Sequence, residues 1–233
     1  MKETDYGNEA KIEEGFLHYL DRAVRIRFRS TTFGTDAVFE HQRMEDWFSL
    51  HGSLAEGQQV VLPTGELSTL TNASGEFSFD ARFPMSGEIV LKGMPVVHRG
   101  SRAISVEETK VAFEALASMS QHAAIATVVD GLIESVRSPH PGPNPFCDSL
   151  EDLFRNDRRY RKVHEIGFGT NRLCASLEPT NFFPNERYPG VHFGLGLGGY
   201  TPFHHDLVCT EIDVLAELDT GELIDVHKAL GLR

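Results

Sequence analysis

The alternation of apolar and polar positions along the first hundred residues predicts a β-rich fold. Residues 11–29 begin with helical spacing and then alternate from Val24 to Arg29, with every second side chain apolar. A period of two residues indicates a strand with one face exposed to water. Short apolar runs broken by glycine and proline continue to residue 105, and the same pattern returns after Lys162. Both regions are therefore expected to form mostly antiparallel sheet.

Turn residues divide these runs into separate strands. Gly34 marks a turn before a second short strand, and Pro63 with Gly65 interrupts the run from residue 57 to 70. Because proline and glycine disrupt a strand ladder, Glu66 is expected at a bend or at a strand end.

The middle of the chain has a different pattern. Residues 106–137 place apolar side chains among alanines, which predicts one long helix or two shorter ones. The Pro-rich segment 138–145 is expected to be a loop, followed by a short helix with Ser149 as its N-cap. The expected fold is α+β: a single domain over residues 1–233 with a β-rich, mostly antiparallel body, and a helical insertion with a Pro-rich loop at 106–160.

Charge and composition narrow the function classes. The 233 residues carry 22 Lys and Arg against 34 Asp and Glu, a net charge of −12, which disfavours nucleic-acid binding through a basic face. No apolar run is long enough to span a membrane, and the N-terminus is too polar for a signal peptide. The three cysteines are widely spaced and odd in number, which favours reduced thiols. We therefore expect a cytoplasmic protein that binds neither nucleic acid nor membrane.

Two histidines and an aspartate stand together in residues 198–212, GGYTPFHHDLVCTEI. On a strand, residues two apart share a face, so His204 and Asp206 would point one way and His205 the other. An imidazole and a carboxylate at this spacing can reach one cation, with His205 left to pack or to support a ligand. The alternative is a solvated loop with charged side chains.

Three further residues could belong to the same site. Glu165 directly precedes Ile-Gly-Phe-Gly, whose glycines allow a ligand or another backbone to come close; the alternative is an edge-strand glutamate in water. His192 lies in GVHFGLGLGG and could instead be a packed core residue, and Glu186 precedes it by six positions, across a Pro-Gly turn. The glycines do not form a phosphate-binding P-loop, because no G-x-x-x-x-G-K-[ST] is present.

These motifs, in their order along the chain, resemble the metal-binding half of the aminopeptidase T family of metallo-aminopeptidases. The resemblance covers roughly residues 30–215 and runs through FGTDAVF, LPTGEL, HEIGFGTN, NERYPGVHFGLG and FHHDLV. It implies the fold of that half, a homodimer and a two-metal centre, with ligands that fall here on Glu66, Glu165, His192, His204 and Asp206. It also implies that Glu186 corresponds to a further carboxylate of the family. Tyr200 lies one residue away from the position at which the family has a tyrosine.

The stretch TPFHHDLV is also similar to the closing T-P-x-H-x-D stretch of the 2,5-dihydroxypyridine dioxygenases, which are iron(II) enzymes. This second resemblance implies iron held by His204, Asp206 and the residue directly before I-G-x-G. That residue is a histidine in the dioxygenases and Glu165 here, and His192 has no counterpart in them.

Three hypotheses follow. The first is a metal-dependent hydrolase of a small-molecule or peptide-like substrate, in which Zn²⁺, Co²⁺, Mn²⁺ or Fe²⁺ activates water, with Glu66 or Glu165 as ligand or general base. The second is a non-haem iron(II) oxygenase that acts on a small aromatic or heterocyclic metabolite. The third is a binding or assembly module that keeps the fold without the metal.

Overall fold

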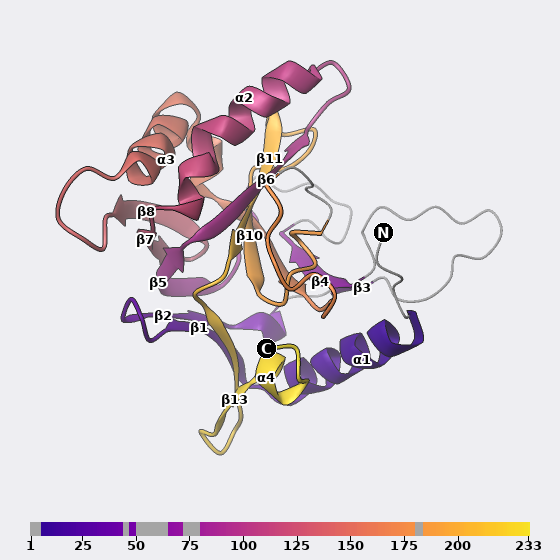
Figure 1. The fold of residues 1–233 in the computed structure, drawn as a ribbon. Helices are drawn as coiled ribbons and strands as arrows, with labels where there is room; N and C mark the ends of the chain where they lie inside the picture. The colour runs from indigo at the N-terminus through magenta and orange to yellow at the C-terminus, as the bar shows by residue number, and fades with distance from the viewer. Residues whose placement is uncertain (1–5, 44–46, 50–64, 72–79, 180–183) are drawn as a thin grey trace.

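The computed structural model describes residues 6–43, 47–49, 65–71, 80–179 and 184–233, which form an α+β fold with two mostly antiparallel sheets and four α-helices (Figure 1). The larger sheet, sheet A, has the strand order β13-β12-β1-β2-β5-β7-β8. Its strands are β1 (Arg25–Ser30), β2 (Thr35–Phe39), β5 (Met85–Leu91), β7 (Ala124–Val129), β8 (Leu132–Arg137), β12 (Asp213–Glu217) and β13 (Leu223–Asp225).

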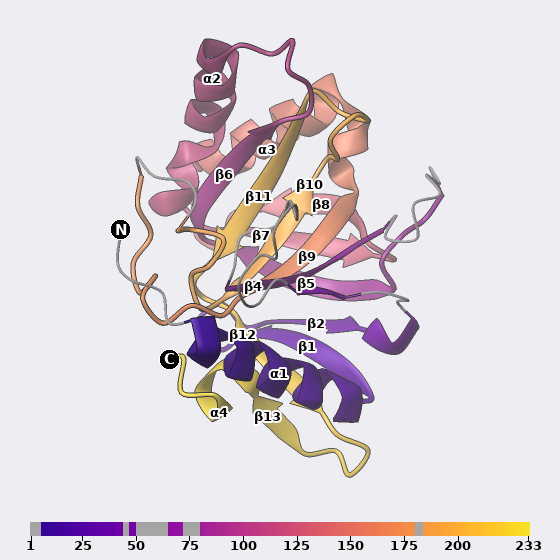
Figure 2. The same ribbon diagram turned by 90° about the vertical axis from the view of Figure 1, so that its right-hand side faces the viewer.

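The smaller sheet, sheet B, has the strand order β3-β4-β9-β10-β11-β6 (Figure 2). Its strands are β3 (Phe48–Ser49), β4 (Glu66–Leu70), β6 (Gly93–Arg99), β9 (Val163–Gly169), β10 (Val191–Leu195) and β11 (Phe203–Cys209). Although β5 and β6 are consecutive in the chain, they belong to different sheets. The chain between them therefore links sheet A to the edge of sheet B.

The helices lie at the ends and edges of this body. They are α1 (Tyr6–Arg22), α2 (Val106–Leu116), α3 (Pro145–Asn156) and α4 (Val226–Ala229). Helix α2 packs against β6 and α3, while α1 and α4 pack against β12 at the other end (Figure 2). No helix in the described part of the chain is both long and apolar enough to cross a membrane.

Aromatic side chains from both sheets meet in one hydrophobic core. Phe28 of β1 contacts Phe193 of β10 edge-on, with ring centroids 5.3 Å apart, and Phe168 of β9 stacks on Phe16 of α1 at 4.9 Å. These four rings are fully buried. Since successive residues of a strand face opposite ways, the alternate residues of β9 and β10 lie on the outer face of sheet B.

The predicted alternation at the N-terminal end is confirmed. Strand β1 buries Ile26 and Phe28 and leaves its arginines partly exposed. On that outer face Arg27 and Arg29 both donate hydrogen bonds to Asp36 of the neighbouring β2, at 2.9–3.1 Å. The β-patterned segments after Lys162 are also strands, and Glu66 is the first residue of β4, as expected. Pro63 lies outside the described residues.

The helical prediction for residues 106–137 is wrong in its second half. Helix α2 ends at Leu116 and a 3-10 turn follows, but residues 124–137 form the hairpin β7–β8. The hairpin turns at Asp130 and Gly131, whose φ angles are +46° and +73°. An Asp-Gly pair between two β-branched runs is a strong hairpin signal. The helical prediction gave more weight to the many alanines of this segment. Within the expected helical insertion, two strands therefore join sheet A.

The short helix after the Pro-rich segment begins earlier than predicted. Its N-cap is Asn144, whose side-chain oxygen accepts hydrogen bonds from the backbone N–H groups of Phe146 and Cys147, and Pro145 occupies the first helical position. Proline suits that position because its missing N–H would have no helical partner there. Ser149 therefore lies inside α3 and does not cap it.

Candidate metal centre

A row of ionisable side chains crosses the outer face of sheet B. Directly opposed residues of an antiparallel pair point to the same face, and Gly194 of β10 lies opposite Glu165 of β9 on one side and Asp206 of β11 on the other. His204 of β11 lies opposite His98 of β6. The strand register alone thus places these groups side by side, on strands that lie next to one another in Figure 2.

Two glycines make the space that the row occupies. A Cβ on Gly194 would lie 2.5 Å from Cε1 of His204 and 2.6 Å from Cβ of Glu165, and a Cβ on Gly167 would overlap the imidazole of His192. Side chains can therefore lie across the sheet surface only because these positions have none. This close approach explains Gly167 of β9 and Gly194 of β10, whereas Gly169 of β9 makes room for the backbone of Tyr188.

Carboxylates and imidazoles alternate along the row. Nε2 of His192 lies 3.1 Å from Glu66 and 3.8 Å from Glu165. Nε2 of His204 lies 3.2 Å from Glu165 and 2.8 Å from Asp206. The row continues through His98 to Glu186, so its order is Glu66, His192, Glu165, His204, Asp206, His98 and Glu186.

Both central carboxylates offer one oxygen to each neighbour. Glu165 presents Oε1 to His192 and Oε2 to His204, while Asp206 presents Oδ1 to His204 and Oδ2 to His98. A carboxylate placed in this way can bridge two adjacent cations.

Burial forces these charges to compensate one another. Burial alone would raise the pKa of Glu165, but hydrogen bonds from His192 and His204 outweigh it and bring the pKa to about 2. Burial also acts to lower the pKa values of His192 and His204, yet the neighbouring carboxylates raise both well above the usual value. Isolated buried charges are costly, so the row needs either protons on its imidazoles or a cation between its members.

The pKa of Glu66 is shifted in the opposite direction from that of Glu165. Burial raises the pKa of Glu66 to about 7, only partly opposed by the hydrogen bond and charge of His192. Near neutral pH, Glu66 can therefore hold or release a proton while Glu165 stays ionised. Two carboxylates with pKa values pushed apart by their surroundings are typical of acid–base sites.

The row contains nitrogen and oxygen atoms that could coordinate a metal ion. Oε2 of Glu66 is buried and has no hydrogen-bond partner among the described residues. Nδ1 of His204 lies 2.7 Å from the carbonyl oxygen of Gly196, and with the proton on Nδ1 this contact turns Nε2 toward Glu165 and Asp206. Three groups of ligand atoms each lie within 4.8 Å of one another: Glu66, Glu165 and His192; Glu165, His204 and Asp206; and His98, Glu186 and Asp206. Such sets of oxygen and imidazole nitrogen suit first-row divalent metals.

The structure brings together all five residues to which the sequence analysis assigned metal ligation, and Glu186 with them: Glu66, Glu165, His192, His204 and Asp206. His205 faces the opposite way, as predicted, and packs against Tyr160 with ring centroids 5.1 Å apart. Tyr200 lies outside the row, against Arg159 and His164.

His98 is the member of the row that the sequence analysis missed. It stands in a plain apolar strand, GMPVVHR, about a hundred positions before His204. The available signal was a lone histidine in a predicted strand, and its importance depends on β6 pairing with β11. That pairing joins distant segments and leaves no local pattern.

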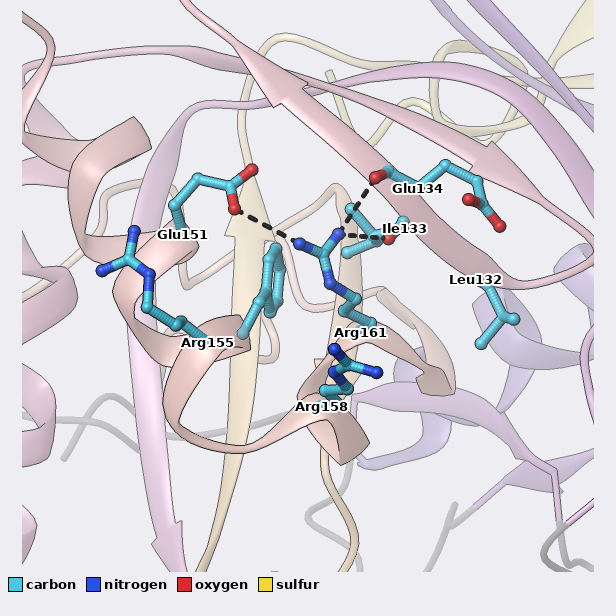
Figure 3. Close-up of a pocket in the computed structure, with 8 residues that line it drawn as sticks. Leu132, Ile133, Glu134, Glu151, Arg155, Arg158 and Arg161 are labelled. Carbon is cyan, nitrogen blue, oxygen red and sulfur yellow. Dashed lines mark hydrogen bonds and ion pairs between the residues drawn. The ribbon is translucent and has the colours of Figure 1, made fainter.

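A separate pocket contains three arginines but none of the row. It has a volume of about 480 Å³ and lies between β8, α3 and the 3-10 turn that follows α3 (Figure 3). Arg161 donates hydrogen bonds to Glu151 and to the carbonyl oxygens of Ile133 and Glu134, and Arg155 pairs with Asp152. Two of the three guanidinium groups are thus held by the protein itself, so the pocket is a weaker candidate than the row.

One comparison with known proteins supports the fold described above, and two others find no match. No protein-family model matches the chain, and no curated protein matches its sequence. The structure is similar to that of the 2,5-dihydroxypyridine dioxygenase from Pseudomonas putida KT2440, with 16% sequence identity and a TM-score of 0.59. The match covers 95% of this chain and 60% of that chain, so this chain spans less than two thirds of that enzyme. The comparisons lend no support to the aminopeptidase T resemblance, and at this identity the likeness shows the fold alone.

The space above Gly194 can be tested by filling it. We expect Gly194→Ala to displace His204 or Glu165, to cost about 1–3 kcal/mol of unfolding free energy, and to weaken binding of divalent cations. Gly198→Ala is the matched control, because a Cβ there meets nothing within 4 Å. Denaturant unfolding and cation titration of both variants measure the two effects. Equal cation affinity in the two variants would contradict the assigned role of Gly194.

Proposed function

We propose that this protein is a metal-dependent oxygenase that binds Fe²⁺ at Glu165, His204 and Asp206 and acts on a small hydroxylated aromatic or heterocyclic substrate. The observation that carries the proposal is the convergence of these three side chains from two strands, two of them buried and His204 partly buried, at mutual ligand-atom distances within 4.8 Å. The likeness in fold to a dioxygenase supports the choice of reaction class. With three protein ligands, a bound Fe²⁺ would have coordination positions left for substrate and oxygen.

The chain's own residues have separable tasks in this proposal. The contact of its Nδ1 with the Gly196 carbonyl holds His204 in position. In the protein without metal, the charges and hydrogen bonds of the neighbouring histidines lower the pKa values of Glu165 and Asp206 against the effect of burial, and a cation held by Nε2 of His204 would supply that positive charge instead. Glu66, whose pKa is raised by burial to about 7, would accept a proton from a hydroxyl group of the substrate. A bound divalent cation would supply Lewis-acid and redox chemistry beside these groups.

Oxygen consumption tests the proposal. Protein stripped of metal and reconstituted with Fe²⁺ without oxygen should consume oxygen when catechol-like or hydroxypyridine substrates are added. His204→Ala should abolish the uptake, while His140→Ala should not, because His140 is an exposed residue outside the row. Absence of uptake with every substrate of these kinds, in protein that retains stoichiometric Fe²⁺, would contradict oxygenase chemistry.

A metal-dependent hydrolase is the second candidate, and one observation favours it. Glu165 belongs to two of the three ligand groups, so it could bridge a pair of cations that together activate water. Release of amine from amino-acid amides by the Zn²⁺- or Co²⁺-loaded protein, with no oxygen consumption by the Fe²⁺ form, would favour hydrolysis. The homodimer and the cytoplasmic location expected from the sequence stay predictions.

A further inference from the structure

We infer that the row has an additional cation position at its exposed end, held by His98, Glu186 and Asp206. It is distinct from the position assigned to the proposed function and uses two residues that neither sequence resemblance names as metal ligands. The inference rests on the proposed metal centre, since both positions share Asp206, but it concerns how many cations the row binds and not which reaction follows.

The geometry of this end meets the requirements of a cation site. Nε2 of His98 lies 2.5 Å from Oε1 of Glu186 and 3.4 Å from Oδ2 of Asp206. The three ligand atoms all lie within 4.8 Å of one another, close to the separation of at most about 4.4 Å that two bonds of about 2.0–2.2 Å to one first-row cation allow. Because Asp206 turns its other oxygen toward His204, it can serve both positions at once.

The surroundings favour a positive charge at this point. The side chains of Glu186 and Asp206 are only 7% and 4% exposed, whereas that of His98 is 45% exposed. Two largely desolvated carboxylates this close need a counter-charge, and the open imidazole side offers a cation a route from solvent. Without a cation, a protonated His98 supplies the counter-charge. Burial acts to lower the pKa of His98, but the hydrogen bonds and charges of Asp206 and Glu186 outweigh burial and raise this pKa to about 10.

The fold fixes the position of Glu186 beside His98. Glu186 lies in the segment that leads into β10, and this segment is tied to the chain after β9 where the backbone N–H of Asn171 donates to the carbonyl oxygen of Arg187 at 3.1 Å. Asn185, the residue before Glu186, is fully buried, and its side chain hydrogen bonds to the backbone of Glu178. Glu186 is therefore held over the sheet by its neighbours on both sides. One imidazole and two carboxylates suit Mn²⁺, Fe²⁺ or Zn²⁺.

The experiment counts bound cations. Chelator-treated protein is titrated with Mn²⁺, and free Mn²⁺ is measured by electron paramagnetic resonance. Wild type should bind one equivalent more than His98→Ala, and Glu186→Gln should lose the same equivalent or bind it at least about 10-fold more weakly. His140→Ala, a histidine change outside the row, should match wild type. Thermal melting of the metal-free variants checks that each is folded, and the exposed His98 should tolerate alanine.

The possible results separate this inference from the proposed function. Equal numbers and affinities of Mn²⁺ in wild type, His98→Ala and Glu186→Gln would overturn the additional position while leaving the site at Glu165 and His204 intact. Loss of every equivalent in His98→Ala would also overturn it, because the position would then not be separate. No Mn²⁺ binding by wild type would overturn the additional position together with the metal centre.

Discussion

Asp206→Asn is expected to weaken the retention of divalent cations by the purified protein by more than about 100-fold. Asp206 belongs to two of the three ligand groups and faces both His204 and His98. Asparagine keeps the size of the side chain but removes its charge and one acceptor oxygen. Changes to residues that only support metal ligands typically cost 10–100-fold in affinity, so loss of a shared ligand should exceed about 100-fold.

Elemental analysis after dialysis against metal-free buffer measures this effect. His204→Ala should lose the cation held by Glu165, His204 and Asp206, and Asp152→Asn, at a largely exposed position on α3, is the matched control. Circular dichroism establishes that each variant is folded. Full metal occupancy in both Asp206→Asn and His204→Ala would refute the assigned ligands and, with them, both enzyme hypotheses.

Phe168→Ala should give the largest loss of stability. Phe168 is fully buried and its ring contacts those of Phe16, Phe28 and Trp47, at centroid distances of 4.9, 6.3 and 5.7 Å. It therefore joins α1, sheet A and the strand that carries Glu165. Removing such a ring leaves a cavity and typically costs 3–5 kcal/mol, a large share of the 5–15 kcal/mol by which domains are usually stable.

Denaturant unfolding followed by tryptophan emission measures this loss directly, because Trp47 is the only tryptophan of the chain and stacks on Phe168. Phe168→Leu should cost less than Phe168→Ala, since it fills more of the space. Val106→Ala, at a side chain that is 74% exposed, should change stability by less than about 0.5 kcal/mol. A loss below about 1 kcal/mol in Phe168→Ala would contradict a shared core.

The difference between the predicted helix and the observed hairpin at residues 124–137 has a physical origin. Alanine favours helices when nothing else acts, and Ala123, Ala124 and Ala126 weighted the pattern in that direction. In the structure these alanines are buried, with Ala124 and Ala126 in β7 beside β5. Packing against a neighbouring strand overrides a propensity that is worth less than about 1 kcal/mol per residue.

The sequence by itself determined which side chains share a face of a strand. The two-residue period of an extended chain is a local property, so His204 and Asp206 could be assigned to one face and His205 to the other, and Gly-rich β9 and β10 could be recognised as strands that something approaches closely. Glu165 and His192 were also candidates from the residues around them, whereas the assignment of Glu66 as a ligand came from resemblance to a known family, and the structure brings all three together.

Only the tertiary structure decided which strands lie next to each other, and hence that the ligands form one alternating row. The pairing of β6 with β11 places His98 beside His204, and the segment before β10 brings Glu186 to the same end. Strand pairing is set by the total burial of apolar surface in the core, to which side chains throughout the chain contribute. No short stretch of sequence contains that information, so the site's exposed end could be found only from the folded chain.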